Sequence, residues 1–291
     1  MKILITGANG MLAKAMVEKF KENNELILTD VTGTGATLDI TNFKEVKDFV
    51  AKTKPEMIIN CAAYTNVDKA EEEKSLAKKI NTIGPKNLAI VAKKNDCLLV
   101  HFSTDYVFGG DLPVEELYRE DDKKTPVTVY GNTKLAGEKE IQAHTDKYYI
   151  FRTAWLYGEG KNFVKTMIKL GRENSQVKVV ADQHGSPTYT KDLVDVVEQV
   201  LNQKLDYGVY HATDLGYTTW AKFAKRIFEM TEINCKVIPV TSEEYGSAAN
   251  RPKNSMISKE RLISLGIYIP SWEEGLENYL REIGEKAIDL F

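Results

Sequence analysis

The stretch Lys2-Ile3-Leu4-Ile5-Thr6-Gly7-Ala8-Asn9-Gly10-Met11-Leu12-Ala13 opens the chain and decides its fold. An apolar run of strand length leads into a glycine-rich turn, and a helical pattern then continues to Phe20. Glycines permit a tight turn and let backbone N–H groups approach a pyrophosphate, which binds at the N-terminus of the helix. The third small position of this turn is Ala13 rather than a glycine. The pattern predicts a dinucleotide site, with a tight turn that binds no ligand as the alternative.

Three side chains further along are placed to bind the adenosine half of a dinucleotide. A predicted second strand, 25–30, ends in Asp30, twenty residues after Gly10. An acid there accepts hydrogen bonds from the ribose 2′-OH and repels a 2′-phosphate, which favours NADH. A strand-end Asp is also a common turn residue. Asp39 and Ile40 are placed to meet the edge and the face of an adenine.

The rest of the chain predicts an α/β protein. Five predicted strands alternate with helices, at 2–6, 25–30, 56–60, 97–103 and 148–152, which indicates a Rossmann-like, doubly wound parallel sheet. Further helices are expected at about 162–172, 191–202, 218–230 and 271–286, and strands at 176–180, 209–211 and 236–240. No linker separates the halves. We expect residues 1–155 to form an NAD(P)-binding Rossmann domain. Residues 156–291 would mainly form a smaller, interleaved α/β substrate lobe, with some segments returning to the first domain.

Composition excludes several classes of protein. The chain has 291 residues, 43% of them hydrophobic, and a net charge of −3, which suits a sizeable core and does not suit a nucleic-acid or membrane-surface protein. No apolar stretch approaches the roughly 18 residues of a spanning helix. The three cysteines and four histidines are scattered without ligand spacing. We therefore expect reduced thiols, a cytoplasmic protein and no structural metal.

Tyr130 and Lys134 stand four residues apart at the start of a predicted helix, which places both on one helical face. A cation near a phenol favours the phenolate and lowers the tyrosine pKa from about 10 toward neutrality. A phenol with such a pKa can act as a general acid or base. Taken alone, the pair has the spacing of many ordinary surface pairs.

Polar residues also close the predicted strand 97–103, where Ser103, Thr104 and Asp105 follow an apolar run. A hydroxyl at this strand end can bind a substrate oxygen, or it can simply begin a turn. The polar, acidic segment 109–125 that follows is predicted to be a loop over the site, because it is too short and too rich in Leu and Tyr for disorder.

Taken together, these segments resemble the extended short-chain dehydrogenase/reductases, and within them the dTDP-4-dehydrorhamnose reductases. The similar segments run in family order over nearly the whole chain: the glycine turn, 60–63, 103–108, 118–122, 129–131 with 134–138, 152–158, 182–188 and 251–255. The sequence departs from the family pattern at Ala13 and in the loop 109–117.

The resemblance implies roles for individual residues. Tyr130 would donate a proton, Lys134 would bind the nicotinamide ribose and favour the ionised tyrosine, and Thr104 would hold the reacting carbonyl oxygen. Thr104, Asp105 and Trp155 would contact the sugar. The complete set of expected cofactor-binding residues is Gly7, Asn9, Gly10, Met11, Leu12, Asp30, Asp39, Ile40, Ala62, Ala63, Tyr64, Tyr130 and Lys134.

The reaction that the resemblance implies is reduction of the C4 keto group of dTDP-4-dehydro-β-L-rhamnose by NADH or NADPH, in nucleotide-sugar and cell-surface polysaccharide biosynthesis. Tyr106 follows Asp105, where the 4,6-dehydratases carry Glu, which disfavours elimination of water. A reductase or epimerase of another nucleotide-linked 4-keto sugar remains an alternative. So does a non-catalytic, dinucleotide-binding regulatory subunit, like the relatives that bind methionine adenosyltransferase. Some relatives also form homodimers with Mg²⁺ at the subunit interface. The resemblance therefore leaves open a homodimer, and Mg²⁺ at its interface, for this chain.

Overall fold

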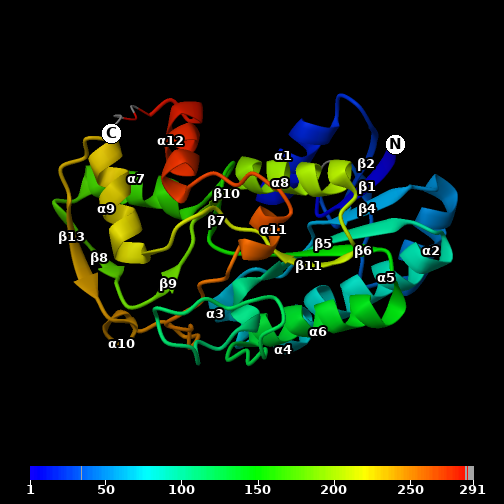
Figure 1. The fold of residues 1–291 in the computed structure, drawn as a ribbon, viewed down its shortest axis with the longest axis horizontal. Helices are drawn as coiled ribbons and strands as arrows, with labels where there is room; N and C mark the ends of the chain where they lie inside the picture. Colours follow the sequence, from blue (N-terminus) through cyan, green and yellow to red (C-terminus); the bar gives the residue numbers. More distant parts are fainter. Residues whose placement is uncertain (34, 286, 288–291) are drawn as a thin grey trace.

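The computed structural model describes residues 1–33, 35–285 and 287, and its centre is a sheet of seven parallel strands (Figure 1). Across the sheet the strands run β11-β6-β5-β4-β1-β2-β3. Their bounds are β1 (Lys2–Thr6), β2 (Glu25–Asp30), β3 (Ala36–Thr37), β4 (Met57–Asn60), β5 (Leu98–Thr104), β6 (Tyr148–Thr153) and β11 (Gly208–His211). The predicted doubly wound parallel sheet is confirmed. It is wider than predicted, since β3 and β11 extend the five expected strands at its two edges.

Helices cover both faces of the sheet, and successive residues of one strand show this directly. Ile3 and Ile5 belong to one buried cluster, which includes α1 (Met11–Phe20) and α8 (Thr190–Gln203). Leu4, between them, belongs to a second cluster on the side of α2 (Phe43–Thr53), α5 (Gly84–Lys94) and α6 (Val129–His144). Side chains alternate across a strand, so an unbroken apolar run such as 3–5 signals burial on both faces.

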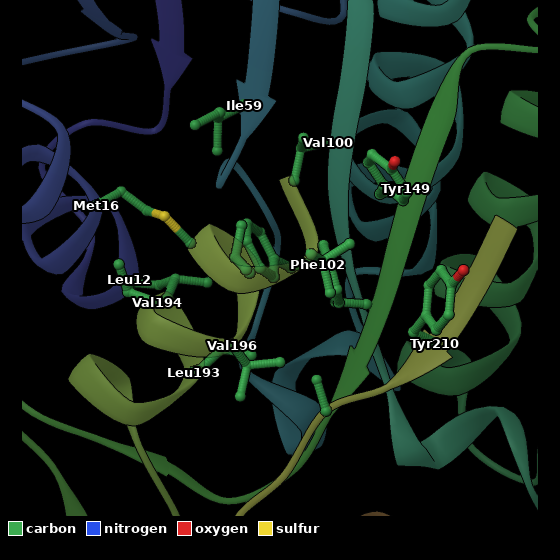
Figure 2. Packing of buried hydrophobic residues seen from close by; sticks show 14 of the residues in the cluster. Leu12, Met16, Ile59, Val100, Phe102, Tyr149, Leu193, Val194, Val196 and Tyr210 are labelled. Carbon is green, nitrogen blue, oxygen red and sulfur yellow. The ribbon is translucent and has the colours of Figure 1, made fainter. Parts of the chain in front are cut away.

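The first cluster joins the two halves of the sequence. Leu193, Val194 and Val196 of α8 pack with Met16 of α1 and Phe102 of the sheet (Figure 2). Burying a side chain of this size stabilises the fold by about 1.5–3 kcal/mol. Because α8 and β11 come from residues after 156, these segments return to the sheet, and the division at 155/156 stays an interpretation of the sequence.

The second lobe lies beside the carboxyl edge of the sheet, at the left of Figure 1. Its helices α7 (Phe163–Glu173), α9 (Trp220–Met230) and α12 (Trp272–Glu282) surround a separate core. They flank the parallel pair β8 (Gln176–Val180) and β13 (Lys236–Val240). The predicted last helix, 271–286, ends at Glu282, and its last predicted residue, Lys286, lies outside the described residues. Shorter elements complete the lobe: β7 (Leu156–Tyr157), β9 (His184–Gly185), β10 (Thr188–Tyr189), β12 (Thr218–Thr219) and α10 (Ser242–Tyr245). Helix α11 (Glu260–Ser264) instead lies against β11, and its Leu262 belongs to the first cluster.

The segment between β4 and α5 is helical but interrupted. It forms α3 (Val67–Ala70) and α4 (Lys74–Lys78), and a π-helical turn, Lys79–Ile83, then leads into α5. Asn81 and Thr82 are buried inside this turn. π-Helical turns frequently occur at functional sites.

Two buried carboxyl groups meet at the N-terminal part of α12 and predict a pH-dependent stability. A Cβ added to Gly275 would lie 2.6 Å from Asp192 Oδ2 and 2.8 Å from Asp214 Oδ2. Burial, and then the charges of Asp195 and Glu274, raise the pKa of Asp192 from 3.8 to about 7. The folded chain therefore holds a proton that the unfolded chain releases, and stability falls as pH rises from about 4 to about 7.

Asp192→Asn is expected to remove the loss of stability that Asp192 causes as the pH rises. Its melting temperature should exceed that of the parent protein by roughly 5 °C at about pH 8, and by less at about pH 5. Asp146→Asn is the matched control, because the Asp146 side chain is 84% exposed. Equal pH dependence of melting in Asp192→Asn and the parent protein would contradict the assignment.

Candidate active site

The glycine turn has a geometry that requires glycine. Gly7 has φ +68°, and a Cβ on it would lie 2.6 Å from the backbone nitrogen of Ala62. Gly10 caps α1 without a side-chain hydrogen bond, and the first turn of α1 contains no acidic residue. The first N–H groups of that helix are therefore left without a side-chain acceptor. This arrangement fits a pyrophosphate, which the N–H groups of the first turn, including Met11 and Leu12, would bind.

Asp30 is fixed by the same turn. Its Oδ2 accepts a hydrogen bond of 3.0 Å from the Asn9 backbone N–H, and its Oδ1 accepts one of 2.7 Å from Val31. The Asn9 side chain donates to the carbonyl of Thr32. The acid thus stands at the end of β2, beside the turn, where an adenosine ribose is expected.

The two residues expected at the adenine differ in exposure. Asp39 is half-buried, and its Oδ1 accepts a hydrogen bond of 2.9 Å from Thr41. The Ile40 side chain is only 4% exposed and packs in the core against Gly84. Adenine contacts by both residues stay predictions, and burial leaves Ile40 little surface for one.

The exit of β4 is joined to α6 through Asn81. The Asn81 side chain accepts a hydrogen bond from Tyr64 N (2.8 Å) and donates one to Tyr64 O (3.0 Å). It also donates to Thr133 Oγ1 in α6 at 3.2 Å. The segment that contains Ala62, Ala63 and Tyr64 is thereby placed beside the start of α6. Sequence reasoning missed Asn81, although the polar pair Asn81-Thr82 interrupts an otherwise helical pattern.

The structure brings the three predicted catalytic side chains together. Thr104 is the last residue of β5, and its hydroxyl donates a hydrogen bond to Asp105 Oδ1 at 2.9 Å. The same hydroxyl lies near Tyr130, in the first turn of α6, and lowers the pKa of that phenol. Lys134, one turn later, is 2% exposed and donates from Nζ to the carbonyl of Phe102 in β5. Helix α6 begins here because the Thr128 hydroxyl accepts a hydrogen bond of 2.9 Å from Gly131.

The predicted lowering of the Tyr130 pKa is wrong for this structure. Burial raises the pKa of Tyr130 to about 12, and the charge of Asp105 raises it by more than the nearby Thr104 hydroxyl lowers it. Burial also lowers the pKa of Lys134 to about 8, against the charges of Glu138 and Cys61. The prediction from the four-residue spacing of Tyr130 and Lys134 did not take burial into account, and burial disfavours the phenolate. Tyr130 is therefore protonated near neutral pH, as a proton donor must be.

Asp105 and Trp155 flank these residues. Asp105 is 2% exposed, and burial raises its pKa to about 7, although the nearby hydroxyls of Ser255 and Thr104 act to lower it. Trp155 has φ +46°, a strained value for a side chain of this size, and its ring stacks on Trp220 at 3.6 Å. Trp155 is thus held by two elements of the second lobe. The Trp220 ring of α9 stacks on it, and Gly185 of β9 lies so close that a Cβ there would be 2.7 Å from the Trp155 ring.

A cavity of 290 Å³ lies mainly in the second lobe and reaches the first lobe at Asp68, and none of the predicted site residues lines it. Its lining includes Asp68 of α3 and the aromatic rings of Phe163 and Trp220, with Arg251 on its wall. Arg251 binds the Asp68 carboxylate with both nitrogens, at 3.1 and 2.7 Å, and bridges the two lobes. A larger cavity, of 700 Å³, is lined by Met1 and other residues at the amino ends of the strands, and contains none of the predicted site residues.

The predicted loop 109–125 is tied to the second half of the chain. Tyr118 is 1% exposed, and its backbone exchanges hydrogen bonds with Met256 (2.9 Å) and Ser258 (2.8 Å). Its ring stacks on Phe108 with centroids 4.4 Å apart. The loop therefore packs from the end of β5 across to residues 254–258.

The described part of the chain contains neither a metal-binding cluster nor a membrane-spanning helix. Within residues 1–33, 35–285 and 287, no group of three or more His, Cys, Asp or Glu side chains is arranged to hold a metal ion. Over the same residues, no helix is both long enough and apolar enough to cross a membrane.

A parallel sheet with a glycine turn, and a Thr, Tyr and Lys set at its carboxyl edge, define a nicotinamide-dependent oxidoreductase of the extended short-chain dehydrogenase/reductase class. The family model described as RmlD substrate binding domain matches residues 1–284. The chain belongs to this family, that of the dTDP-4-dehydrorhamnose reductases.

Relatives match over nearly their full length. The dTDP-4-dehydrorhamnose reductase of Salmonella typhimurium is 36% identical, over 97% of this chain and 98% of its own. The crystal structure of a dTDP-4-dehydrorhamnose reductase from Clostridium acetobutylicum has a TM-score of 0.93 and 47% identity, covering 98% of this chain and 100% of that one. The reductase of Bacillus anthracis, solved in complex with NADP, has a TM-score of 0.91 and 44% identity, with 97% and 99% covered.

Proposed function

We propose that this protein reduces the C4 keto group of dTDP-4-dehydro-β-L-rhamnose with NADH or NADPH, giving dTDP-L-rhamnose. The observation that carries the proposal is the meeting of Thr104, Tyr130 and Lys134 beside a glycine turn built for a dinucleotide. The relatives named as reductases of this substrate match over their full length. A cytoplasmic location and a homodimer stay predictions.

The chain's own residues would perform the proton chemistry. A bound nicotinamide supplies the hydride. The Thr104 hydroxyl, which already meets Tyr130, would hold the carbonyl oxygen as negative charge develops on it. Tyr130, protonated in its buried setting, would donate the proton that neutralises this oxygen. Lys134 would hold the nicotinamide ribose and supply positive charge behind the phenol. Asp105 and Trp155 would position the sugar.

The two alternatives are distinguished by turnover. Reduction or epimerisation of another nucleotide-linked 4-keto sugar would use the same residues, so the reductase is tested with a panel of dTDP- and UDP-linked ketosugars. A regulatory subunit is disfavoured because Thr104, Tyr130 and Lys134 are all present and meet in one place. Recovery of a stoichiometric partner enzyme, without turnover of any ketosugar in the panel, would instead support the regulator.

We also propose that the protein accepts both cofactors and favours NADH, since Asp30 stands at the end of β2 with its carboxylate fixed by the turn. Asp30→Asn keeps an acceptor for the Asn9 N–H and removes the negative charge that would repel a 2′-phosphate. The ratio of kcat/KM for NADPH to that for NADH should rise by about 10-fold, or roughly 1.4 kcal/mol. The measurement is steady-state oxidation of both cofactors. An unchanged ratio would show that Asp30 does not select the cofactor.

A further inference from the structure

Helix α6 carries one more buried, charged side chain on the face that holds the catalytic pair. Tyr130, Lys134, Glu138 and Gln142 follow one another at intervals of four residues, so each lies about one turn after the last. Glu138 is 1% exposed. A carboxylate this deeply buried needs partners for both of its oxygens.

Each Glu138 oxygen has a partner, and the partners lie on the neighbouring strands β5 and β6. Oε1 accepts hydrogen bonds from the Ser103 hydroxyl and from Arg152 Nε at 2.9 Å, and Oε2 accepts one from Arg152 Nη2 at 2.7 Å. Ser103 of β5 pairs in register with Arg152 of β6, and Thr104 is the next residue. Glu138 therefore joins α6 to both strands at the row directly before Thr104.

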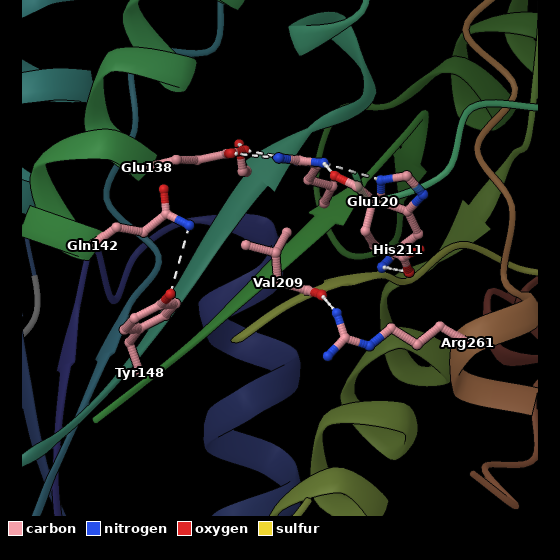
Figure 3. Close-up of polar contacts among 9 residues, drawn as sticks. Glu120, Glu138, Gln142, Tyr148, Val209, His211 and Arg261 are labelled. Carbon is pink, nitrogen blue, oxygen red and sulfur yellow. Dashed lines mark hydrogen bonds and ion pairs between the residues drawn. The ribbon is translucent and has the colours of Figure 1, made fainter. Parts of the chain in front are cut away.

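The remaining nitrogen of Arg152, Nη1, is held by Glu120 and His211, which Figure 3 labels. Nη1 donates to the carbonyl of Glu120 at 3.1 Å and lies 3.2 Å from His211 Nε2. His211 Nδ1 lies 3.2 Å from the carbonyl of Ser258, so Nδ1 carries the hydrogen and Nε2 accepts from Arg152. Burial and Arg152 hold the pKa of His211 well below its usual range, so this histidine is neutral. The Arg152 cation thus forms its ion pair with Glu138, and the Glu120 carboxylate is near enough to feel its charge.

The negative charge of the Glu138 carboxylate also raises the pKa of Lys134. The groups around the Lys134 ammonium are Cys61 at the end of β4, His101 of β5, and Glu138 on α6 itself. Burial holds the pKa of Cys61 at about 12 and that of His101 well below its usual range, so both are neutral near pH 7. Glu138 is then the charged member of this set, and its charge supports a protonated Lys134 against burial.

We propose that Glu138 is a positioning residue for the reduction: it fixes the end of β5, and with it Thr104, against α6, and it sets the electrostatic field at the Lys134 ammonium. This inference rests on the proposed ketone reduction. Arg152 and its partners on β11 and the 109–125 loop keep the carboxylate in one orientation. A buried ion pair contributes little to stability by itself, and such a pair is better suited to fixing one arrangement of the elements that it joins.

The test uses four variants of the full chain, with kcat and KM measured over pH 6 to 10. Glu138→Gln keeps the shape and removes the charge. We expect kcat to fall about 10-fold or more. The alkaline limb of the kcat–pH profile should move to a lower pH by about one unit, because Lys134 loses its proton more easily without the Glu138 charge. Ser103→Ala breaks only the link to the strand end, and kcat should fall by about 3-fold without a shift of that limb. Ser103→Thr, which keeps the hydroxyl, should restore most of the activity.

Gln142→Ala is the matched control, because Gln142 occupies the next turn of the same helical face. Among the described residues, its side-chain amide forms one hydrogen bond, to the Tyr148 hydroxyl at 3.5 Å. Its kcat and pH profile should equal those of the parent protein. A folded Glu138→Gln protein with the parent's kcat and alkaline limb would overturn the inference. If Glu138→Gln does not fold, Ser103→Ala with the parent's kcat overturns it instead. If the parent protein reduces no ketosugar, the proposed function fails, which is a separate and distinguishable outcome.

Discussion

Tyr130→Phe is expected to lower kcat for ketosugar reduction by roughly 10²–10⁴-fold, the usual contribution of a positioned proton donor. The ring contact would survive, because the edge of one ring faces the other in the Tyr106 and Tyr130 pair, with centroids 6.1 Å apart. The hydroxyl that meets Thr104 would be lost. KM for the cofactor should change by less than about 3-fold, since the ring of residue 130 and all the other expected cofactor-binding residues are kept. The measurement is steady-state oxidation of NADH or NADPH by absorbance.

The control for this variant is Tyr210→Phe. Tyr210 is another buried tyrosine, but its hydroxyl donates to the carbonyl of Asp206 at 2.6 Å, before β11 and away from the site. Its loss should cost some stability and leave kcat unchanged. A Tyr130→Phe protein within tenfold of the parent's rate would remove Tyr130 from the proton-transfer step.

Gly7→Ala is expected to weaken cofactor binding by about 100-fold or more, which corresponds to roughly 2.8 kcal/mol. The new Cβ would lie 2.6 Å from Ala62 N and 2.7 Å from Ala62 Cα, both backbone atoms. Alanine also resists φ +68° at a cost of about 1–3 kcal/mol. To relieve this close contact, the glycine turn must move away from the exit of β4. Cofactor binding should weaken, because the cofactor is expected to contact both segments.

Gly160→Ala distinguishes the close contact from backbone strain alone. Gly160 has φ +96°, and a Cβ there would meet no atom within 4 Å. Its substitution should lower the melting temperature slightly and leave the dissociation constant of NADH, measured by nicotinamide fluorescence, unchanged. Wild-type cofactor affinity in a folded Gly7→Ala protein would contradict the assigned turn.

Local patterns were enough to predict the frame of the site. The apolar run 2–6, the glycines after it and the helix to Phe20 define a strand, turn and helix whose geometry the structure confirms. Parallel strands end at one edge of their sheet, so the polar end of β5 and the start of α6 were expected to meet. Thr104, Tyr130 and Lys134 do lie together there.

Features that depend on distant parts of the chain could not be predicted. Strand β11 has four residues, and it joins the sheet only because it pairs with β6, about sixty residues earlier. The raised pKa of Tyr130 comes from burial and from Asp105, which the four-residue spacing does not reveal. The Glu138 carboxylate finds Arg152 across the gap between a helix and a strand, and either residue alone reads as an ordinary charge in the sequence.

The most direct test of the central claim is incubation of the purified protein with dTDP-4-dehydro-β-L-rhamnose and NADH or NADPH carrying deuterium at the transferable position of the nicotinamide. The reduction predicts oxidation of one cofactor per sugar and deuterium bound at C4 of the dTDP-L-rhamnose, seen by NMR. No cofactor oxidation with this sugar, or a product without deuterium at C4, would contradict it.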